Sequence, residues 1–230
     1  MFKRFESWVE PLPSEEPQQP PKGIYAFCRH YTRGFEVPLV IMSILTAMLA
    51  ILEVSLFGFM GDLVDLLVKH DPDTLFEQEG MRLLGMTLLV LVVIPLLTLL
   101  HALIVYQGLL GNYPMSIRWL AHRYLLKQSV SFYQNDFAGR VATKVMQTSL
   151  AVRETVTKLL DVLVYILVYF TSMVVMIAKA DLRLMLPMLI WLAVYVVLQM
   201  RFLPQLKKVS TEQADARSTM TGRIVDSYTN

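Results

Sequence analysis

The chain has 230 residues, of which 55% are hydrophobic and 17% are charged, whereas a soluble globular domain has about 25% charged residues. Its mean hydropathy of +0.49 and its single cysteine exclude a disordered chain and a disulfide-bonded secreted domain. The net charge of +2 is not the basic excess that nucleic-acid binding needs. We therefore expect a membrane protein without a nucleic-acid partner.

The first 36 residues divide into a polar leader and a short amphipathic segment. Residues 1–22 are polar and rich in proline, which predicts a proline-rich leader. In residues 23–36 the apolar side chains recur at helical spacing, so we expect an elbow helix that lies in the membrane interface. The alternative is a plain extended leader. The apolar residues of this segment are Ile24, Phe27, Cys28 and Tyr31.

Four long gaps between charged residues predict four membrane-spanning helices. Three gaps have 16 or 17 residues without Asp, Glu, Lys or Arg, and the fourth, between Arg82 and His101, has 18 residues without any ionisable side chain. A spanning helix needs about 20 predominantly apolar residues. The apolar runs are continuous and do not alternate with polar residues, which indicates an all-α bundle and not a β-structure. The expected spans are about 38–60, 84–108, 160–179 and 182–203.

The distribution of Lys and Arg predicts the orientation of these spans. Residues 1–37, the link 109–159 and the tail from residue 201 together hold 17 of these residues, and the opposite side holds 4. Cytoplasmic flanks carry the excess of Lys and Arg. Both termini and the link are therefore expected in the cytoplasm, and the acidic residues 61–81 are expected to form an outside loop.

The link of about 50 residues between the second and third spans is expected to fold into two helical stalks. Apolar or small residues recur at helical spacing over residues 117–130 and 141–159. Twenty residues of helix would extend about 30 Å from the membrane, with residues 131–139 as the turn, and Pro114 should kink the first stalk. The alternative is a pair of amphipathic helices on the membrane surface. The side chains expected to face away from the apolar residues of the first stalk are Arg118, His122, Arg123 and Lys127.

Ionisable side chains within the spans are candidate functional groups. Glu53 and His101 would contact a cation or a drug in a translocation pathway; the alternatives are a headgroup contact for Glu53 and a packing hydrogen bond for either. Asp161 is expected to pair with Lys158, three residues before it. Because these acids and the histidine are single and dispersed in the sequence, we expect neither a catalytic site nor a metal site.

Three stretches resemble the transmembrane domain of ABC exporters. Residues Ala47–Leu67 (AMLAILEVSLFGFMGDLVDLL) look like the first span of that family and its acidic exit to the outside. Residues Leu120–Val156 are similar to its first intracellular loop, with Gly139 and Arg140 at matching places. A threonine stands in the helix after them where many members have an aspartate. Residues Val209–Asp226 (VSTEQADARSTMTGRIVD) resemble the approach to the second intracellular loop.

The resemblance implies an all-α bundle with four of the family's six spans, so the chain is expected to be an N-terminal fragment of a longer transporter. Residues 37–230 would be a partial transmembrane domain, with a first intracellular loop at about 109–159 and a truncated second loop at about 204–230. The turn between the stalks would be the first coupling helix, which docks on a nucleotide-binding domain, and about Gly222–Asn230 would begin the second. The residues implied for the first coupling helix are Ser131, Phe132, Tyr133, Gln134, Asn135 and Asp136.

The resemblance also implies partners, cargo and location. It implies a second transporter half, as a homodimer or heterodimer, in the plasma membrane (the bacterial inner membrane), with lipophilic compounds or lipids as cargo. ATP and magnesium would bind the nucleotide-binding domain, because this chain has no Gly-Lys dipeptide and so no phosphate-binding loop. No cofactor and no catalytic residue are expected in this chain, and ATP hydrolysis would belong to the intact homologue. The alternative is a self-contained four-span anchor or assembly protein without transport activity.

Overall fold

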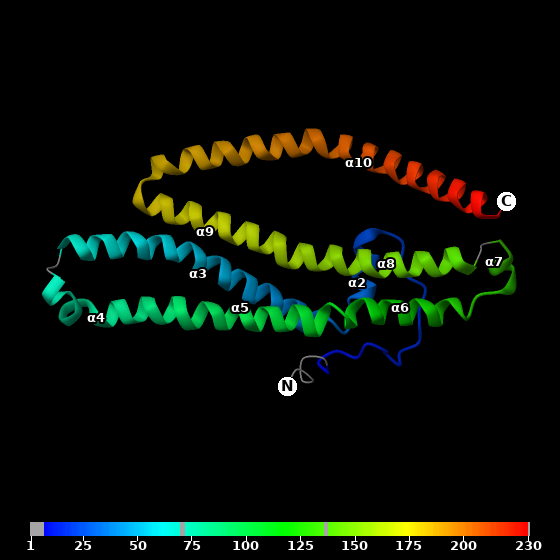
Figure 1. Cartoon of the computed structure of the whole chain (residues 1–230), viewed down its shortest axis with the longest axis horizontal. Coiled ribbons are helices and arrows are strands. Elements are labelled where there is room, and N and C mark those ends of the chain that lie inside the picture. Colours follow the sequence, from blue (N-terminus) through cyan, green and yellow to red (C-terminus); the bar gives the residue numbers. More distant parts are fainter. Residues whose placement is uncertain (1–6, 70–71, 136–137, 230) are drawn as a thin grey trace. The chain divides into compact units, whose positions relative to one another are not determined.

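The computed structural model describes residues 7–69, 72–135 and 138–229, and every regular element in these ranges is a helix (Figure 1). The chain divides into two compact units, Met1–Met173 and Val174–Asn230. The elements in chain order are α2 (Ile24–Tyr31), α3 (Glu36–Lys69), α4 (Pro72–Leu88), η1 (Leu89–Val93), α5 (Ile94–Leu103), η2 (Ile104–Leu109), α6 (Asn112–Leu125), α7 (Val130–Asn135), α8 (Ala138–Lys158), η3 (Leu159–Leu163), α9 (Val164–Ala180), η4 (Leu182–Leu184) and α10 (Met185–Thr229).

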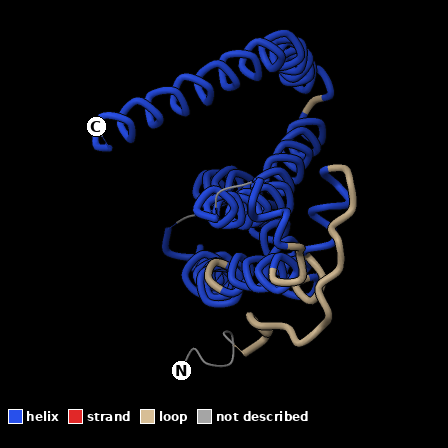
Figure 2. The backbone as a smooth tube through the Cα atoms, turned by 90° about the vertical axis from the view of Figure 1, so that its right-hand side faces the viewer, coloured by secondary structure: helices blue, strands red, loops and turns tan. Residues whose placement is uncertain are grey.

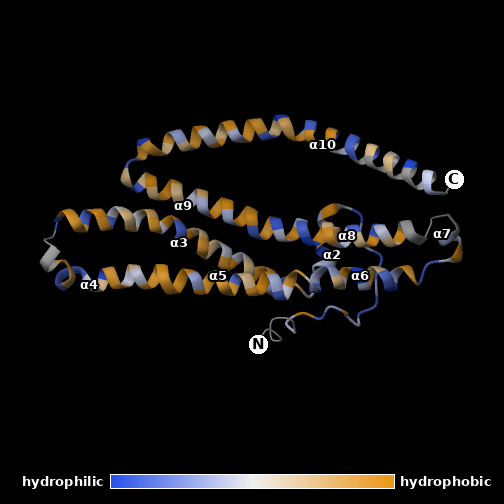
Figure 3. Cartoon of the chain, in the orientation of Figure 1, coloured by the Kyte–Doolittle hydropathy of each residue, from blue (hydrophilic) through white to orange (hydrophobic). Residues whose placement is uncertain are grey.

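Four helical stretches are long and apolar enough to cross a membrane, which confirms the all-α fold and the four expected spans. Figure 3 shows apolar residues along α3, α5, α9 and the first part of α10. Each stretch is longer than the roughly 20 residues that cross a bilayer, so the helices extend beyond the hydrocarbon layer. The four stretches are Glu36–Lys69, Leu75–Leu125, Val141–Ala180 and Leu182–Gln213.

Residues 61–69 and 72–81, expected as part of an outside loop, are helical, and their location outside the membrane stays a prediction. α3 continues to Lys69 and α4 begins at Pro72, because apolar residues go on recurring at helical spacing after the first span. A guanidinium nitrogen of Arg82 lies 2.9 Å from a carboxylate oxygen of Asp62 and links the two helices. Both side chains are 47% exposed, so this ion pair adds little stability.

The buried core of the first unit lies where the membrane helices pass into the predicted stalks. The ring of Phe35 packs on that of Tyr113 with the centroids 4.7 Å apart, and the hydroxyl groups of Thr32 and Tyr113 lie 2.8 Å apart. Residues of α3, η2, α6 and α8 surround this contact and are almost fully buried. They are Leu39, Met42, Leu45, Ile104, Leu109, Ile117, Val152 and Val156.

Helices α6 and α8 lie side by side and are joined at one end by α7 (Figure 1), and we call them the stalk pair. They continue the second and third spans, as the two predicted stalks do. Arg118 was expected on the polar face of the first stalk, away from its apolar residues, but it contacts α8. Its Nε donates to Oγ of Ser149 at 2.9 Å, because the hydroxyl of Ser149 is buried on the facing side of α8 and needs polar partners there.

The second unit contains the end of α9, η4 and α10. Only Asp181 separates α9 from η4, which confirms the short connection expected between the third and fourth spans. A carboxylate oxygen of Asp181 accepts a hydrogen bond from the backbone N–H of Arg183 at 2.7 Å, as an N-cap residue does. α10 then continues through Pro204 to Thr229, so the residues predicted as a truncated second intracellular loop are helical.

Candidate functional site

Polar side chains on one face of α3 bond to the third span. Ser43, Thr46 and Glu53 are separated by three and seven residues, a spacing that puts them on one face of the helix, with the fully buried Ala50 between them. Their partners come from η3, α9 and α5. We call this set of groups the polar seam; it comprises Ser43, Thr46, Glu53, His101, Asp161, Tyr165 and the backbone carbonyl of Leu160.

The centre of the polar seam is a three-residue cluster from three different spans. Nε2 of His101 lies 3.1 Å from Oδ1 of Asp161 and 3.1 Å from Oγ1 of Thr46. The Thr46 hydroxyl also donates to Asp161. With a proton on Nε2, His101 can donate to the carboxylate of Asp161. The side chains of His101 and Asp161 are 21% and 28% exposed, so the carboxylate is held mainly between helices.

Two expectations about these residues are wrong. Asp161 does not pair with Lys158, because its carboxylate bonds to His101 and Thr46 instead. Asp161 lies in η3, where a π-helical turn changes which neighbours share a helix face. Nor are the ionisable groups dispersed, because residues 60 positions apart in the sequence, His101 and Asp161, meet in space.

Glu53 bonds to the third span at a different level of the polar seam. The Tyr165 hydroxyl donates to Oε2 of Glu53 at 2.5 Å, and the Tyr165 ring stacks on Tyr169 at a centroid distance of 5.5 Å. Glu53 follows Thr46 by seven residues, which corresponds to about 10 Å along a helix. The polar seam thus holds two carboxylates at two levels.

Ser43 adds a contact at the other end of the polar seam. Its hydroxyl donates to the backbone carbonyl of Leu160 at 2.7 Å. Leu160 lies in η3, where the regular i→i−4 hydrogen-bond ladder of the helix is interrupted. A side-chain donor from another helix therefore stabilises the interrupted turn that carries Asp161.

The groups of the polar seam can donate and accept hydrogen bonds and can contact a proton or a cation. Within the described ranges, no third histidine, cysteine or carboxylate joins His101 and Asp161 to complete a metal site. An acid inside a membrane is costly unless a partner or a cavity compensates for it. The carboxylates of Glu53 and Asp161 each accept at least one hydrogen bond from another span. The polar seam therefore ties the first, second and third spans together.

The sequence identifies Glu53, His101 and Asp161 as ionisable residues of the spans but does not identify their partners. Thr46 and Tyr165 are ordinary residues of apolar helices, and neither is ionisable at neutral pH. The signal available in the sequence is the spacing of Ser43, Thr46 and Glu53 along one helix face. That spacing predicts a polar stripe but does not name the helix that it faces.

The tip of the stalk pair contains the residues implied for the coupling helix. α7 is a single short helix from Val130 to Asn135. The Tyr133 hydroxyl donates to the backbone carbonyl of Leu125 at 2.7 Å, and the rings of Phe132 and Tyr133 meet edge to face at 5.2 Å. These two rings remain 39% and 36% exposed. Ser131 lies in the same helix with its hydroxyl 2.9 Å from that of Ser129; Gln134 and Asn135 complete α7, and Asp136 lies outside the described residues.

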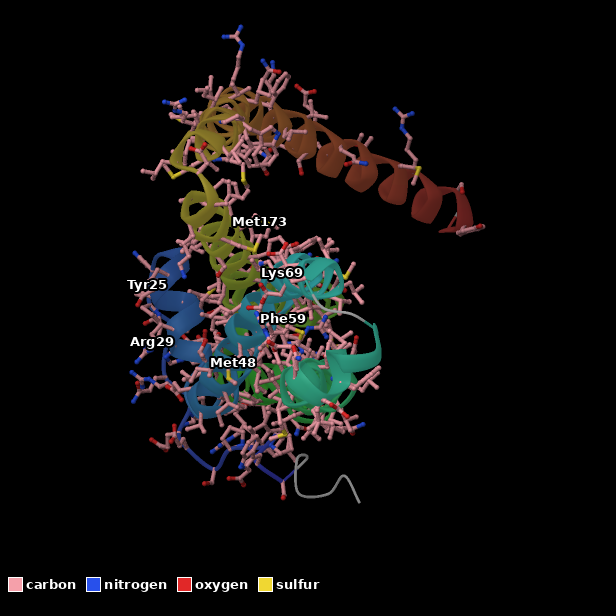
Figure 4. All side chains as sticks on the ribbon, turned by 90° about the vertical axis from the view of Figure 1, so that its left-hand side faces the viewer. Tyr25, Arg29, Met48, Phe59, Lys69 and Met173 are labelled. Atoms are coloured by element: carbon pink, nitrogen blue, oxygen red, sulfur yellow. The ribbon has the colours of Figure 1, made fainter. Side chains whose placement is uncertain are left out.

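A helix is present in the segment expected to form the elbow. In α2, Tyr31 is buried and Cys28 is half-buried, while Ile24 and Tyr25 are more than 80% exposed. Figure 4 shows Tyr25 and Arg29 on the outside of α2. Burial raises the pKa of the Cys28 thiol. The position of α2 at a membrane interface stays a prediction.

Comparisons with known proteins agree with this architecture. Residues 39–230 match the family model described as the ABC transporter transmembrane region. A curated protein of Haemophilus influenzae, described as an uncharacterized ABC transporter ATP-binding protein, is 41% identical over 234 residues. That alignment covers 100% of this chain and 38% of the relative, so the chain spans well under half of the relative's length. No solved structure matches this chain.

Proposed function

Because the chain belongs to the family of ABC transporter transmembrane regions, we propose that it forms the membrane-spanning part of an ATP-driven exporter. The observation that carries this proposal is the family match over residues 39–230. The relative from Haemophilus influenzae is described as ATP-binding, which supports a nucleotide-binding domain as the partner of this chain. ATP and magnesium would bind to that domain. The proposed cargo is a lipophilic compound or a lipid.

The tip of the stalk pair is the proposed contact with the nucleotide-binding domain. Exposed aromatic rings contribute large apolar area to an interface, and Phe132 and Tyr133 are each more than a third exposed at the tip. α7 is held to α6 by the hydrogen bond from Tyr133 to Leu125. A displacement of α7 would therefore be transmitted to α6 and, along α6, to the membrane helices. These contacts support Ser131–Asp136 as a coupling segment.

The polar seam is the proposed polar part of the translocation pathway. Glu53 and His101 are ionisable groups within the spans, and such groups mark transport pathways in many membrane proteins. Their hydrogen bonds to Tyr165 and Asp161 would hold them between helices and exchange for a cationic cargo when the helices separate. The two transporter halves would line the pathway together, in the plasma membrane and with both termini in the cytoplasm.

The test uses vesicles that hold this chain together with a nucleotide-binding domain. We expect Phe132→Ala and Tyr133→Ala to leave ATP binding intact and to lower the amount of a lipophilic dye or fluorescent phospholipid moved per ATP hydrolysed. Tyr133→Phe is the matched control for the ring, because it removes only the hydroxyl that bonds to Leu125. It should lower the thermal stability of the stalk pair and retain more coupling than Tyr133→Ala.

Two outcomes would contradict the proposal. Unchanged coupling in a stable Tyr133→Ala protein would exclude the coupling role of α7. The absence of ATP-driven movement for either probe, together with no binding of a nucleotide-binding domain, would instead favour a self-contained four-span anchor.

A further inference from the structure

The part of the leader that the structure describes does not extend freely into solvent but lies along α6. Figure 2 shows it as a loop on the outside of the helices. Two donors on the outer face of α6 bond to its main chain. Nε1 of Trp119 donates to the carbonyl of Pro13 at 3.1 Å, and Nη1 of Arg123 donates to the carbonyls of Pro13 at 3.1 Å and Glu15 at 2.8 Å. The first stalk thus recognises the backbone of an extended segment.

The composition of the leader suits this mode of recognition. Proline has no N–H and favours an extended backbone whose carbonyls are free to accept external hydrogen bonds. The guanidinium of Arg123 lies 5.8 Å from the centroid of the Trp119 ring, a cation–π contact that holds the two donors together. α6 therefore presents a prearranged pair of donors to the carbonyls near Pro13.

Both ends of the bound segment are also held. Val9 is 5% exposed and belongs to the core that contains Tyr31 and Tyr113. At the other end, Nζ of Lys127 lies 3.4 Å from Oε1 of Glu16. Residues 9–16 therefore run in the same direction as α6, from the core toward α7.

We propose that Trp119 and Arg123 of α6, together with Lys127 in the turn after it, form a docking surface for an extended, acidic, proline-containing peptide, and that residues 9–16 of this chain are its ligand. The match is chemical as well as geometric, because the ligand carries three glutamates and the surface carries two cations. Only residues 17–23 connect the bound segment to α2, and α2 packs against α8. A linker this short keeps the effective concentration of the ligand in the millimolar range. The leader therefore restrains α6, and α2 restrains α8, so both helices of the stalk pair are held.

This proposal goes beyond export and does not depend on it. Docking of residues 9–16 would stiffen α6 close to the tip, and release would leave the stalk freer to move. Trp119 and Arg123 bond to main-chain atoms, so most of the specificity comes from an extended backbone at Pro13. The ion pair of Glu16 and Lys127 is largely exposed, so high salt should weaken docking only slightly.

The first experiment is zero-length cross-linking of the intact chain in detergent or vesicles. A carbodiimide should join the carboxylate of Glu16 to the amine of Lys127 as an amide, and peptide mass spectrometry should locate the link. Glu16→Gln and Lys127→Arg should each abolish this link, the second while keeping the positive charge. Glu10→Gln is the matched control and should leave it unchanged. Absence of the link in the intact chain would overturn the proposal.

The second experiment measures how fast a protease that cuts after glutamate cleaves the leader at Glu15 and Glu16. Arg123→Ala should raise the cleavage rate roughly tenfold or more, because hydrogen bonds from a charged donor are among the stronger ones. Arg118→Ala is the matched control, because Arg118 lies on the same helix but bonds to Ser149 of α8. Trp119→Phe should give an intermediate rate. Equal acceleration by Arg118→Ala and Arg123→Ala would show general loosening of the stalk and would overturn specific docking.

Discussion

Arg153 donates a hydrogen bond from Nη1 to the backbone carbonyl of Leu110 at 3.3 Å, and so joins α8 to the base of α6. In a continuous helix this carbonyl would accept the N–H of residue 114, but that residue is proline and has no N–H. Arg153 therefore supplies the donor that Pro114 lacks. The Arg153 side chain is 17% exposed, so water competes only weakly for the bond.

Arg153→Ala should lower the stability of the chain by about 1.5–3 kcal/mol, the range for a hydrogen bond to a charged group. In a Pro114→Ala background the same change should cost less, because residue 114 then donates its own N–H to Leu110. A double-mutant cycle on apparent Tm in detergent measures the difference. Equal costs in both backgrounds would assign the effect of Arg153 to its contact with Glu154.

Tyr165→Phe should destabilise the contact between the first and third spans by about 1–3 kcal/mol, because it leaves the Glu53 carboxylate without its donor. Adding Glu53→Gln should recover part of this loss, since a neutral amide costs less in a membrane than a carboxylate. Thermal unfolding in detergent is the measurement. Tyr169→Phe is the control for losing a neighbouring hydroxyl. If it lowered Tm as much as Tyr165→Phe, the bond to Glu53 would not be the cause.

The orientation predicted from 17 against 4 basic residues can be tested with single cysteines after Cys28→Ser. An impermeant maleimide should label Asp65→Cys in whole cells. It should label Ser131→Cys only after the membrane is permeabilised, because the stalk pair is expected in the cytoplasm. The reverse pattern would overturn both the orientation and the proposed contact with a nucleotide-binding domain.

The Cys28 thiol should react slowly with iodoacetamide at neutral pH. Burial raises its pKa, so at neutral pH the reactive thiolate is rarer than in a free cysteine, and its fraction should rise only as the pH approaches the raised pKa. Ile24→Cys in a Cys28→Ser background is the matched control, because residue 24 lies on the same helix and is 82% exposed. Equal alkylation rates at both positions would contradict the packing of α2.

The spans and stalks could be predicted because each depends on local composition or periodicity. The polar seam could not be predicted. Helical spacing puts Thr46 and Glu53 on one face of α3, but it does not determine which side chains α5 and the π-helical turn with Asp161 present to that face. Arg118 shows the same limit: a charged residue on an amphipathic helix is expected in water, but the buried Ser149 opposite it provides an acceptor. Docking of the leader was not predicted from the sequence, because the acceptors that Trp119 and Arg123 bind are backbone carbonyls, which every residue has.

The polar seam has a consequence for the biosynthesis of the chain. Glu53 precedes its donor Tyr165 by 112 residues, so at about 5–20 residues per second the ribosome needs on the order of ten seconds to deliver the third span. Until then α3 has to enter the bilayer on its apolar residues alone, with the Glu53 carboxylate lacking its donor; an aspartate at the centre of a spanning helix costs about 2.5–3.5 kcal/mol. Shortening the apolar run of α3 should therefore reduce the yield of inserted protein, even where the finished seam would have tolerated the change.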